Sequence, residues 1–307
     1  MFRFEKEQKV FDIAGVKVGG QPGEYPTVLI GSIFYDRHKI VKNEAKGEFD
    51  KKQAEMLINN VKEISEKTKN PFFLDVVGNT SDALIKYIDF VSSATDCPFL
   101  IDAPSPKARL PAIKHALEIG LRDRAIYNSI DYLVTDEEAN SLRDLNVQNA
   151  VVMAFTPKKP WSEGRIDILK GYSGQKGLLK FAEEAGVKNL LVDTAVTDVP
   201  GIGVAAKAIH LVKNEFGLPT GCGPANAVTM WKRLKKGEFG QYGYNVCSGG
   251  SGIVTQMMGA NFVLYGPVEL SESAFIACAM TDAVIAYTVK RMGTTIKTKD
   301  HPLYKIF

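Results

Sequence analysis

Short apolar runs and longer amphipathic segments alternate along this chain. The short runs are typical of buried parallel strands, whereas the apolar residues of the longer segments recur at helical spacing. One expected helix, over residues 51–69, has its apolar face marked by Ala54, Leu57, Ile58, Val61 and Ile64. The expected strands cover residues 27–30, 72–76, 99–102, 125–128, 150–155, 189–193, 218–221 and 262–265.

This alternation predicts an α/β fold, specifically a TIM (βα)8 barrel, in which a helix follows each strand. A doubly wound open sheet is the alternative. No GxGxxG motif follows the first strand and no run is a candidate edge strand, which disfavours that alternative. Because composition does not change along the chain, we expect residues 1–307 to form a single domain.

A β-hairpin is predicted ahead of the first barrel strand. Two β-prone runs within residues 10–18 surround Gly15, and a glycine-rich turn follows over residues 19–23. We expect residues 1–26 to close the N-terminal end of the barrel.

Two segments are expected to be irregular. Residues 35–50 are polar and predict a long loop after the first strand. Residues 239–252 are rich in glycine and aromatic residues and predict a loop before a short helix over residues 253–258. Within that stretch, Gly249-Gly-Ser-Gly252 weakly resembles a phosphate-binding turn, although it lacks the GxxxxGK[ST] pattern.

Composition narrows the class of protein. The chain has 307 residues, 45% hydrophobic and 24% charged, which is typical of a soluble globular protein. A net charge of +3 without a basic stripe does not favour nucleic-acid binding. The most apolar stretch, residues 274–289, is interrupted by Asp282, so no membrane span is expected. Four scattered cysteines without a CxxC motif and a charged N-terminus predict a cytoplasmic protein without a signal peptide.

Polar residues follow several of the expected strands, namely Asp75, Asp102, Asn128, Asp193 and Asn226. In a parallel barrel the carboxyl ends of the strands share one face, so these side chains are expected to form one pocket. Capping of the following helices is the alternative role for each of them. A pocket of Asp and Asn without Lys or Arg suits a neutral heterocycle rich in N–H donors, such as a pterin.

Other candidate residues support weaker hypotheses. Glu269 could join Asp75, Asp102 and Asp193 in an oxygen-only Mg²⁺ site, as in a Mg²⁺-dependent lyase. The segment containing His38 is similar to the Asp-x-His-x-x-Gly motif of corrinoid-binding domains, but Val41 stands where the glycine belongs.

The remaining histidines, His115, His210 and His301, are expected to be structural.

The chain as a whole resembles the pterin-binding methyltransferases, which share the dihydropteroate synthase-like TIM barrel. The segments that carry the resemblance are residues 33–41, 74–80, 126–129, 191–194 and 221–226. In that family, Asp and Asn at strand ends hold the pterin ring, and an Asn after the seventh strand lies near N5. The resemblance therefore implies that Asp75, Asp102, Asn128, Asp193 and Asn226 bind a pterin and that Asp75 and Asn226 act in catalysis. The DxGxxSTRPG stretch of the condensing synthases is absent from the sequence.

The resemblance also implies an activity and partners. The N5-methyl group of methyl-tetrahydromethanopterin would pass to the cob(I)amide of a corrinoid carried by a separate subunit. That complex would be the sodium-pumping, coenzyme M-methylating complex of methanogenesis, peripheral to the cytoplasmic face of the membrane. This chain itself would bind no metal and no cofactor. A methyl-tetrahydrofolate-dependent enzyme outside that complex and a non-catalytic scaffold subunit with a relic pocket are the alternatives.

The last expected helix, over residues 271–291, is apolar nearly all round. One face must pack on the barrel, and the other predicts a homodimer interface. Burial beneath the C-terminal tail is the alternative.

Overall fold

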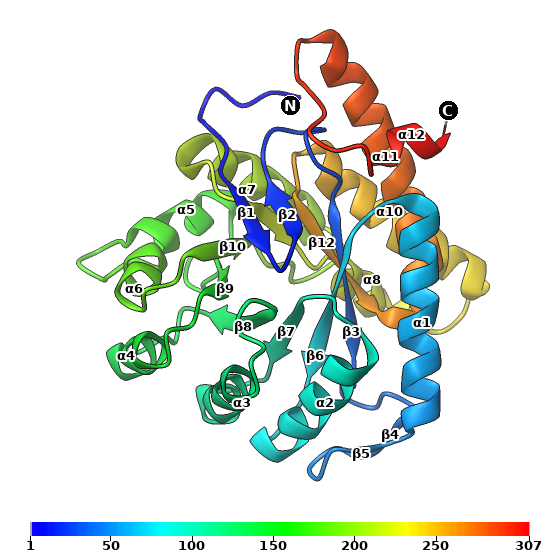
Figure 1. Cartoon of the computed structure of the whole chain (residues 1–307). Helices are drawn as coiled ribbons and strands as arrows, with labels where there is room; N and C mark the ends of the chain where they lie inside the picture. The colour runs from blue at the N-terminus through cyan, green and yellow to red at the C-terminus, as the bar shows by residue number, and fades with distance from the viewer. Residues whose placement is uncertain (1, 307) are drawn as a thin grey trace.

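The computed structural model describes residues 2–306 and contains a closed barrel of parallel strands surrounded by helices (Figure 1). Strand β12 pairs with β3, which closes the barrel and rules out an open sheet. In order around the barrel the strands are β3 (Val28–Ile33), β6 (Phe72–Val77), β7 (Phe99–Asp102), β8 (Ala125–Ile130), β9 (Asn149–Met153), β10 (Asn189–Asp193), β11 (Thr220–Cys222) and β12 (Phe262–Pro267). The predicted TIM-barrel fold is therefore confirmed.

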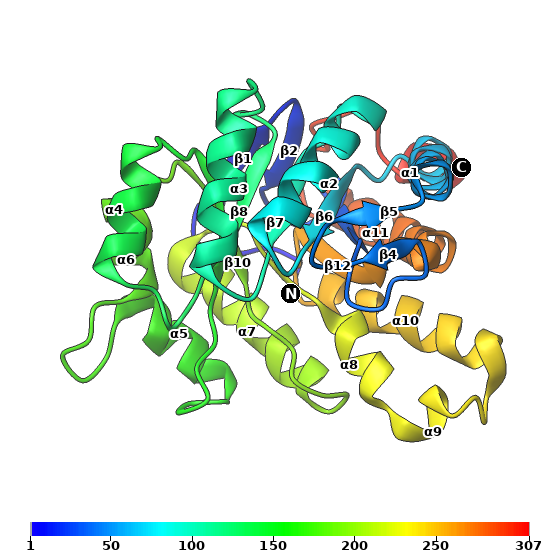
Figure 2. The same cartoon turned by 90° about the horizontal axis from the view of Figure 1, so that it is seen from below.

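Helices follow the strands and form the outer layer (Figure 2). They are α1 (Lys51–Thr68), α2 (Ser81–Ala94), α3 (Pro106–Glu118), α4 (Asp136–Asp144), α5 (Ser162–Lys170), α6 (Leu178–Glu184), α7 (Gly201–Phe216), α8 (Pro224–Met230), α9 (Lys232–Lys235), α10 (Gly240–Met257), the 3₁₀ turn η1 (Val268–Leu270), α11 (Ser271–Arg291) and α12 (Leu303–Ile306). Two helix starts follow directly from sequence. Asp50 accepts a hydrogen bond from the Gln53 amide at 3.1 Å, and Thr135 accepts one from the Glu138 amide at 3.2 Å.

The N-terminal hairpin forms as predicted, from β1 (Val10–Ile13) and β2 (Val16–Gly19). Ile13 and Val18 are buried against the apolar residues that fill the barrel interior, which are Val28, Ile30, Phe73, Leu100, Ile126, Val151, Leu191 and Phe262. The hairpin thus covers one end of an interior that is a packed core, and the opposite end is left to carry the polar residues (Figure 1).

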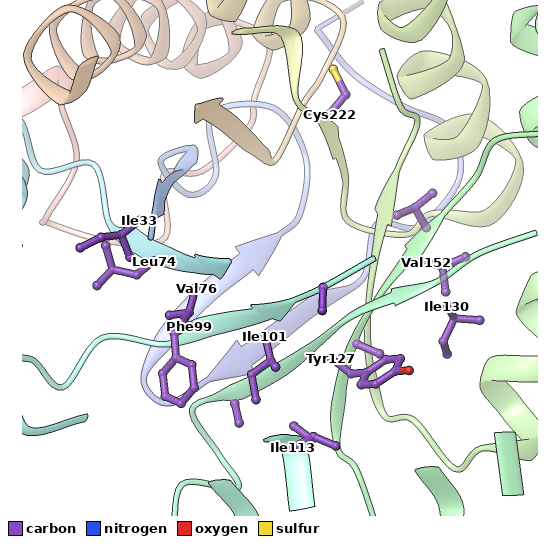
Figure 3. Close-up of a cluster of buried hydrophobic side chains, with 14 of the residues drawn as sticks. Ile33, Leu74, Val76, Phe99, Ile101, Ile113, Tyr127, Ile130, Val152 and Cys222 are labelled. Atoms are coloured by element: carbon purple, nitrogen blue, oxygen red, sulfur yellow. The ribbon is translucent and has the colours of Figure 1, made fainter. Parts of the chain in front are cut away.

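A second apolar layer lies between the strands and the helices. It includes Ile33, Leu74, Val76, Phe99, Ile101, Tyr127 and Val152 (Figure 3). On each strand these residues alternate with the inward-facing ones: Phe99 and Ile101 belong to the outer layer, whereas Leu100 between them belongs to the interior. This alternation determines which strand-end residues face into the barrel.

The two segments expected to be irregular contain regular structure. Residues 35–50 include a small antiparallel pair, β4 (Val41–Asn43) with β5 (Glu48–Phe49). Residues 240–257 form the continuous helix α10, so the phosphate-turn interpretation of Gly249–Gly252 is wrong. The glycines serve close packing on α11 instead. A Cβ at Gly249 would lie 3.1 Å from the Ala277 Cβ, and one at Gly252 would lie 3.1 Å from the Cys278 sulfur.

Two further helical regions are interrupted. The helical region up to residue 186 divides into α5 and α6, and the helix after β11 divides at Trp231 into α8 and α9. Trp231 has an extended backbone (φ −70°, ψ 102°), which interrupts the helical hydrogen bonding.

Helix α11 packs along α10, α1 and α12. Together with η1 it is long and apolar enough to cross a membrane by length and composition alone. However, 56% of its most apolar 18-residue stretch is buried inside the fold. Its buried residues include Asp282, which accepts hydrogen bonds from residues at the base of the barrel. The burial favours a core helix.

Candidate functional site

Strand periodicity brings the polar strand-end residues into the barrel. On β6, β7, β8 and β10, the residue two positions before the candidate (Phe73, Leu100, Ile126 and Leu191) belongs to the apolar interior. Successive side chains of a strand point to opposite faces, so Asp75, Asp102, Asn128 and Asp193 face inward one layer nearer the carboxyl end. The polar layer therefore sits directly on the apolar core.

A cavity of about 410 Å³ lies at this carboxyl end of the barrel. All five predicted residues line it, including Asn226 from the first turn of α8. The full lining is Ser32, Asp75, Val77, Asp102, Ala103, Pro104, Arg109, Asn128, Ser129, Asp131, Met153, Asp193, Asn226, Leu264 and Gly266. A volume of this size is in the range of sites for small organic ligands.

Helix capping does not explain the strand-end residues. The helices after β6, β7, β8 and β10 have other N-cap residues, namely Thr80, Ser105, Thr135 and Pro200. Asp75, Asp102, Asn128 and Asp193 are therefore left with their side chains in the cavity. Only Asp193 makes a local backbone bond, in which the Ala195 amide donates to Oδ1 at 2.7 Å.

Asp75 is held in place by two cavity neighbours. The Ser32 hydroxyl donates to Oδ2 at 2.7 Å, and the Asn128 amide donates to Oδ1 at 3.5 Å. Burial nevertheless raises the pKa of Asp75 to about 6, with both hydrogen bonds opposing that rise. At neutral pH this carboxyl group can therefore exchange a proton.

The surroundings of Asp193 and Asp102 also raise the pKa values of their carboxyl groups. Burial raises the pKa of Asp193 to about 6, with nearby Asp75 adding to the rise. Burial also raises the pKa of Asp102 well above its usual range, and the charges of Asp75 and Asp193 contribute. Three carboxyl groups that disfavour one another's ionisation will bind N–H donors strongly, because such donors stabilise the charged form.

Sequence reasoning missed four polar residues of the cavity, Ser32, Arg109, Ser129 and Asp131. Arg109 corrects the expectation of a pocket without Lys or Arg. It lies in the first turn of α3, 3% exposed, and its Nη1 donates to the Ala103 carbonyl at 2.7 Å. Its helical spacing to the buried Ile113 and Ala116 could have suggested that it is buried, but not which groups it contacts.

His38 and Glu269 bind each other beside the cavity and do not line it. The His38 Nδ1 accepts the Phe34 amide at 3.0 Å, and its Nε2 lies 2.9 Å from the Glu269 carboxylate. Both ring nitrogens are thus engaged, and His38 is not available as a cobalt ligand.

The Mg²⁺ hypothesis does not gain support either. Glu269 is engaged with His38 and Tyr35. Across residues 2–306, no group of three or more His, Cys, Asp or Glu residues is placed to hold a metal ion.

The remaining histidines lie outside the cavity. His115 contacts Asp89, His210 contacts Asn214, and His301 accepts the Leu303 amide in the C-terminal segment.

Comparisons with known proteins identify the family to which the chain is similar. The family described as tetrahydromethanopterin S-methyltransferase MtrH subunit matches residues 6–297. The chain is 44% identical over 310 residues to the MtrH subunit of tetrahydromethanopterin S-methyltransferase from Methanothermobacter thermautotrophicus. It is 45% identical over 319 residues to the same protein of Methanococcus vannielii, and both alignments cover 100% of each chain.

The fold has a solved counterpart at low sequence identity. Xanthomonas albilineans dihydropteroate synthase in complex with 7,8-dihydropteroate has a TM-score of 0.63 and 17% identity, covering 91% of this chain and 99% of that one. This similarity concerns the barrel alone. The full-length matches go further: the chain belongs to the family of MtrH subunits of tetrahydromethanopterin S-methyltransferase.

Proposed function

We propose that the chain binds methyl-tetrahydromethanopterin in the carboxyl-end cavity and transfers its N5-methyl group to the cobalt of a corrinoid. The observation that carries this proposal is the convergence of Asp75, Asp102, Asn128, Asp193 and Asn226 in one cavity of a chain that belongs to this family. The remaining steps of coenzyme M methylation fall to other subunits of the complex.

The cavity suits one edge of a pterin ring. That edge presents adjacent N–H donors, and carboxylates accept such donors in pairs. The carboxyl groups of Asp102 and Asp193 have acceptor capacity to spare, because no hydrogen bond from the described residues reaches the Asp102 carboxyl and only one reaches the Asp193 carboxyl. Asn128 and Asn226 add amides that can match adjacent donors and acceptors on the ring.

Methyl transfer has a clear requirement at N5. The bond between N5 and the methyl carbon breaks, a cobalt–carbon bond forms with the electron pair of the reduced cobalt, and N5 keeps the electron pair of the broken bond and takes up a proton. Asp75, with a pKa raised to about 6, is suited to supply that proton directly or through water. Asn226 would hydrogen-bond at N5, and the cavity would hold the ring so that cobalt approaches in line.

Methyl transfer to free cob(I)alamin tests this function. Methyl-tetrahydromethanopterin and methyl-tetrahydrofolate are offered separately, and methylcobalamin formation is followed spectroscopically. We expect turnover with the former and at least tenfold less with the latter. A preference for the folate would indicate an enzyme outside the methanogenic complex. No turnover with either donor, or full turnover by an Asn226→Ala variant, would contradict the proposed catalytic role.

We further propose that a corrinoid-carrying subunit docks on the rim of the cavity. A corrinoid is too large to enter a barrel filled with side chains, so cobalt must approach from above a bound pterin. The rim offers exposed aromatic residues, with Trp161 69% exposed before α5 and Tyr242 82% exposed on α10. The segment of residues 35–50 with β4 and β5 is a third candidate contact.

Docking predicts a difference between acceptors. Trp161→Ala with Lys158→Glu should slow transfer to the carrier subunit while sparing transfer to free cob(I)alamin. Lys158 is the better lysine to reverse, because Lys159 binds Asp167 at 2.5 Å and supports the loop itself. Equal slowing with both acceptors would show that this loop serves the pterin site or the fold.

The exposed face of α11 supports a proposed homodimer. Ile276, Met280, Val284 and Tyr287 recur at helical spacing and are each about half exposed. A contiguous apolar stripe of this kind is typical of a subunit interface, and two-fold pairs are the commonest assembly. Light scattering should give the mass of a dimer, and Val284→Glu should give a monomer; a wild-type monomer at micromolar concentration would contradict the interface. We also propose that the chain lies in the cytoplasm at the membrane surface, where partner subunits hold it.

A further inference from the structure

Two buried arginines stand behind the candidate pterin ligands in equivalent positions. Arg109 lies in the first turn of α3, and Arg165 lies in the first turn of α5. They are 3% and 2% exposed, unusually low for arginine. Neither was expected from the sequence pattern, and neither is absorbed by the proposed methyl transfer.

Each arginine binds the backbone directly after one cavity aspartate. The Arg109 Nη1 donates to the carbonyl of Ala103, the residue after Asp102, at 2.7 Å. The Arg165 Nε donates to the carbonyl of Thr194, the residue after Asp193, at 3.0 Å, and its Nη2 reaches the Ala195 carbonyl at 3.3 Å. In both cases the guanidinium fixes the turn from which the aspartate enters the cavity.

Each arginine also ties that turn to a neighbouring loop. Arg109 reaches Glu138 of α4 at 3.5 Å and lies over the ring of Tyr127. Arg165 donates to the carbonyls of Pro160 and Trp161 in the loop after β9. Arg109 therefore joins the turn after β7 to α4, and Arg165 joins the loop after β9 to the turn after β10.

Charge gives the pair a second role. Four carboxyl groups line the cavity, those of Asp75, Asp102, Asp131 and Asp193, and Arg109 is the one cation among the described residues that line it. Arg109 opposes the rise in the pKa of Asp102, and Arg165 opposes the rise in the pKa of Asp193. Each cation thus acts on the aspartate whose turn it binds.

We propose that Arg109 and Arg165 are positioning residues that hold Asp102 and Asp193, respectively, in place and favour the ionised form that accepts ligand N–H groups. The substrate role of those aspartates rests on the proposed function, whereas the pairing of each arginine with its aspartate does not.

Several charged or titratable groups surround each arginine–aspartate pair and affect the pKa of its aspartate. Asp102 faces Asp75 of β6, Asp193 of β10 and Arg109. Arg109 in turn faces Tyr127 of β8, Asp131 after β8 and Glu138 of α4. Burial raises the pKa of Glu138, and the hydrogen bond from Tyr127 and the charge of Arg109 oppose that rise.

On the second side, Asp193 faces Asp75, Arg165 and the buried thiol of Cys222.

The test is a carboxyl ¹³C titration of the ligand-free chain, with Asp102→Asn and Asp193→Asn used to assign the two resonances. Removing one arginine charge should raise the midpoint of its own aspartate by about one pH unit, because a nearby opposite charge favours the ionised form. Arg109→Gln should move Asp102 more than Asp193, and Arg165→Gln should do the reverse. Lys207→Gln, which removes a surface cation paired with Glu163, is the matched control and should move neither.

Lysine variants keep the inference testable if a glutamine variant does not fold. Arg109→Lys and Arg165→Lys retain the charge but lose the forked contacts, so the midpoints should stay within a few tenths of a unit of wild type while pterin affinity falls several-fold. Unchanged midpoints in both glutamine variants would overturn the inference, as would midpoints in the lysine variants shifted by about one unit. Because the titration contains no pterin, its result is independent of whether the proposed function is correct.

Discussion

The two ends of strand β3 carry the same interaction in opposite contexts. At its start, the Thr27 hydroxyl donates to Asp282 at 2.7 Å, and near its end the Ser32 hydroxyl donates to Asp75 at 2.7 Å. Burial raises the pKa of both aspartates to about 6. The two ends differ in how many other donors surround the carboxyl groups.

At the end closed by the hairpin, donors are plentiful. Asp282 also accepts the Thr27 amide at 2.9 Å, the Asn70 side chain at 2.6 Å and the Gln256 side chain at 3.1 Å. At the open end the carboxyl groups of Asp75, Asp102 and Asp193 together accept only three hydrogen bonds from the described residues, and the carboxyl group of Asp102 accepts none of them. A satisfied buried carboxyl stabilises the fold, whereas an unsatisfied one is costly to the fold and available to a ligand.

The largest expected effect is at the closed end. Asp282→Ala should lower the free energy of unfolding by about 3–5 kcal/mol, because several buried donors from Thr27, Asn70 and Gln256 lose their acceptor together. Urea denaturation measures this loss. A loss below about 1 kcal/mol would mean that water or repacking replaces the carboxylate, and the closed end would then not be a stability site.

The open end should respond in the opposite way. Asp102→Ala should weaken pterin binding by roughly 10- to 100-fold, since ring N–H groups lose their acceptor in a desolvated site. Its unfolding free energy should stay the same or rise, because Asp75 and Asp193 are relieved of a like charge. Isothermal titration and urea denaturation give the two values.

The control for that variant lies just before the same strand. Asp96→Ala, ahead of β7, removes a fully exposed carboxylate whose nearest cation, a nitrogen of Arg124, is 3.8 Å away. It should leave both quantities unchanged. Equal pterin affinity in the Asp96→Ala and Asp102→Ala proteins would exclude Asp102 as a ligand.

Sequence alone predicted the barrel and the open-end aspartates for one physical reason. Both depend on local periodicity: apolar strand runs predict the core, and the residue that ends each run must face the shared pocket. The Gly-rich stretch in α10 was wrongly expected to be a loop, because helical glycines are unfavourable until tertiary packing on α11 requires them.

Arg109 and Asp282 could not be predicted in the same way. Their roles depend on partners distant in sequence, such as Glu138 for Arg109 and Thr27 for Asp282. The apolar pattern of residues 274–289 made Asp282 look like an interruption of the helix, whereas the structure makes it a hydrogen-bonding centre. Long-range polar pairing leaves no periodic signal.

A smaller effect should depend on pH. Because folding raises the pKa of Asp193 to about 6, its neutral form favours the folded state. The stability it contributes is complete below the unfolded value near 4 and is lost as pH rises through about 6. Asp193→Asn mimics the neutral form and keeps an oxygen for the Ala195 amide. It should therefore match wild type near pH 4 and be more stable by about 2 kcal/mol above pH 7.

The closed end supplies the contrast for this titration. Asp282→Asn places amide hydrogens against the donors of Asn70 and Gln256, so it should be less stable than wild type at every pH. Urea midpoints between pH 4 and 8 give both profiles. An Asp193→Asn advantage that does not change with pH would show that charge is not what makes the open end costly.

The smallest effect compares the two hydroxyl groups of β3 directly. Ser32→Ala removes one donor from Asp75 and leaves the Asn128 amide, so pterin affinity should fall about fivefold, or about 1 kcal/mol, with little change in stability. Thr27→Val removes the equivalent donor from Asp282 and also an acceptor of the Gln256 amide. It should lower the unfolding free energy by about 1 kcal/mol and leave pterin affinity unchanged, because Asp282 keeps three other donors. If both substitutions changed pterin affinity and unfolding free energy by the same amounts, one end of the barrel would not serve stability and the other ligand binding. The small number of donors around the open-end carboxyl groups would then need another explanation.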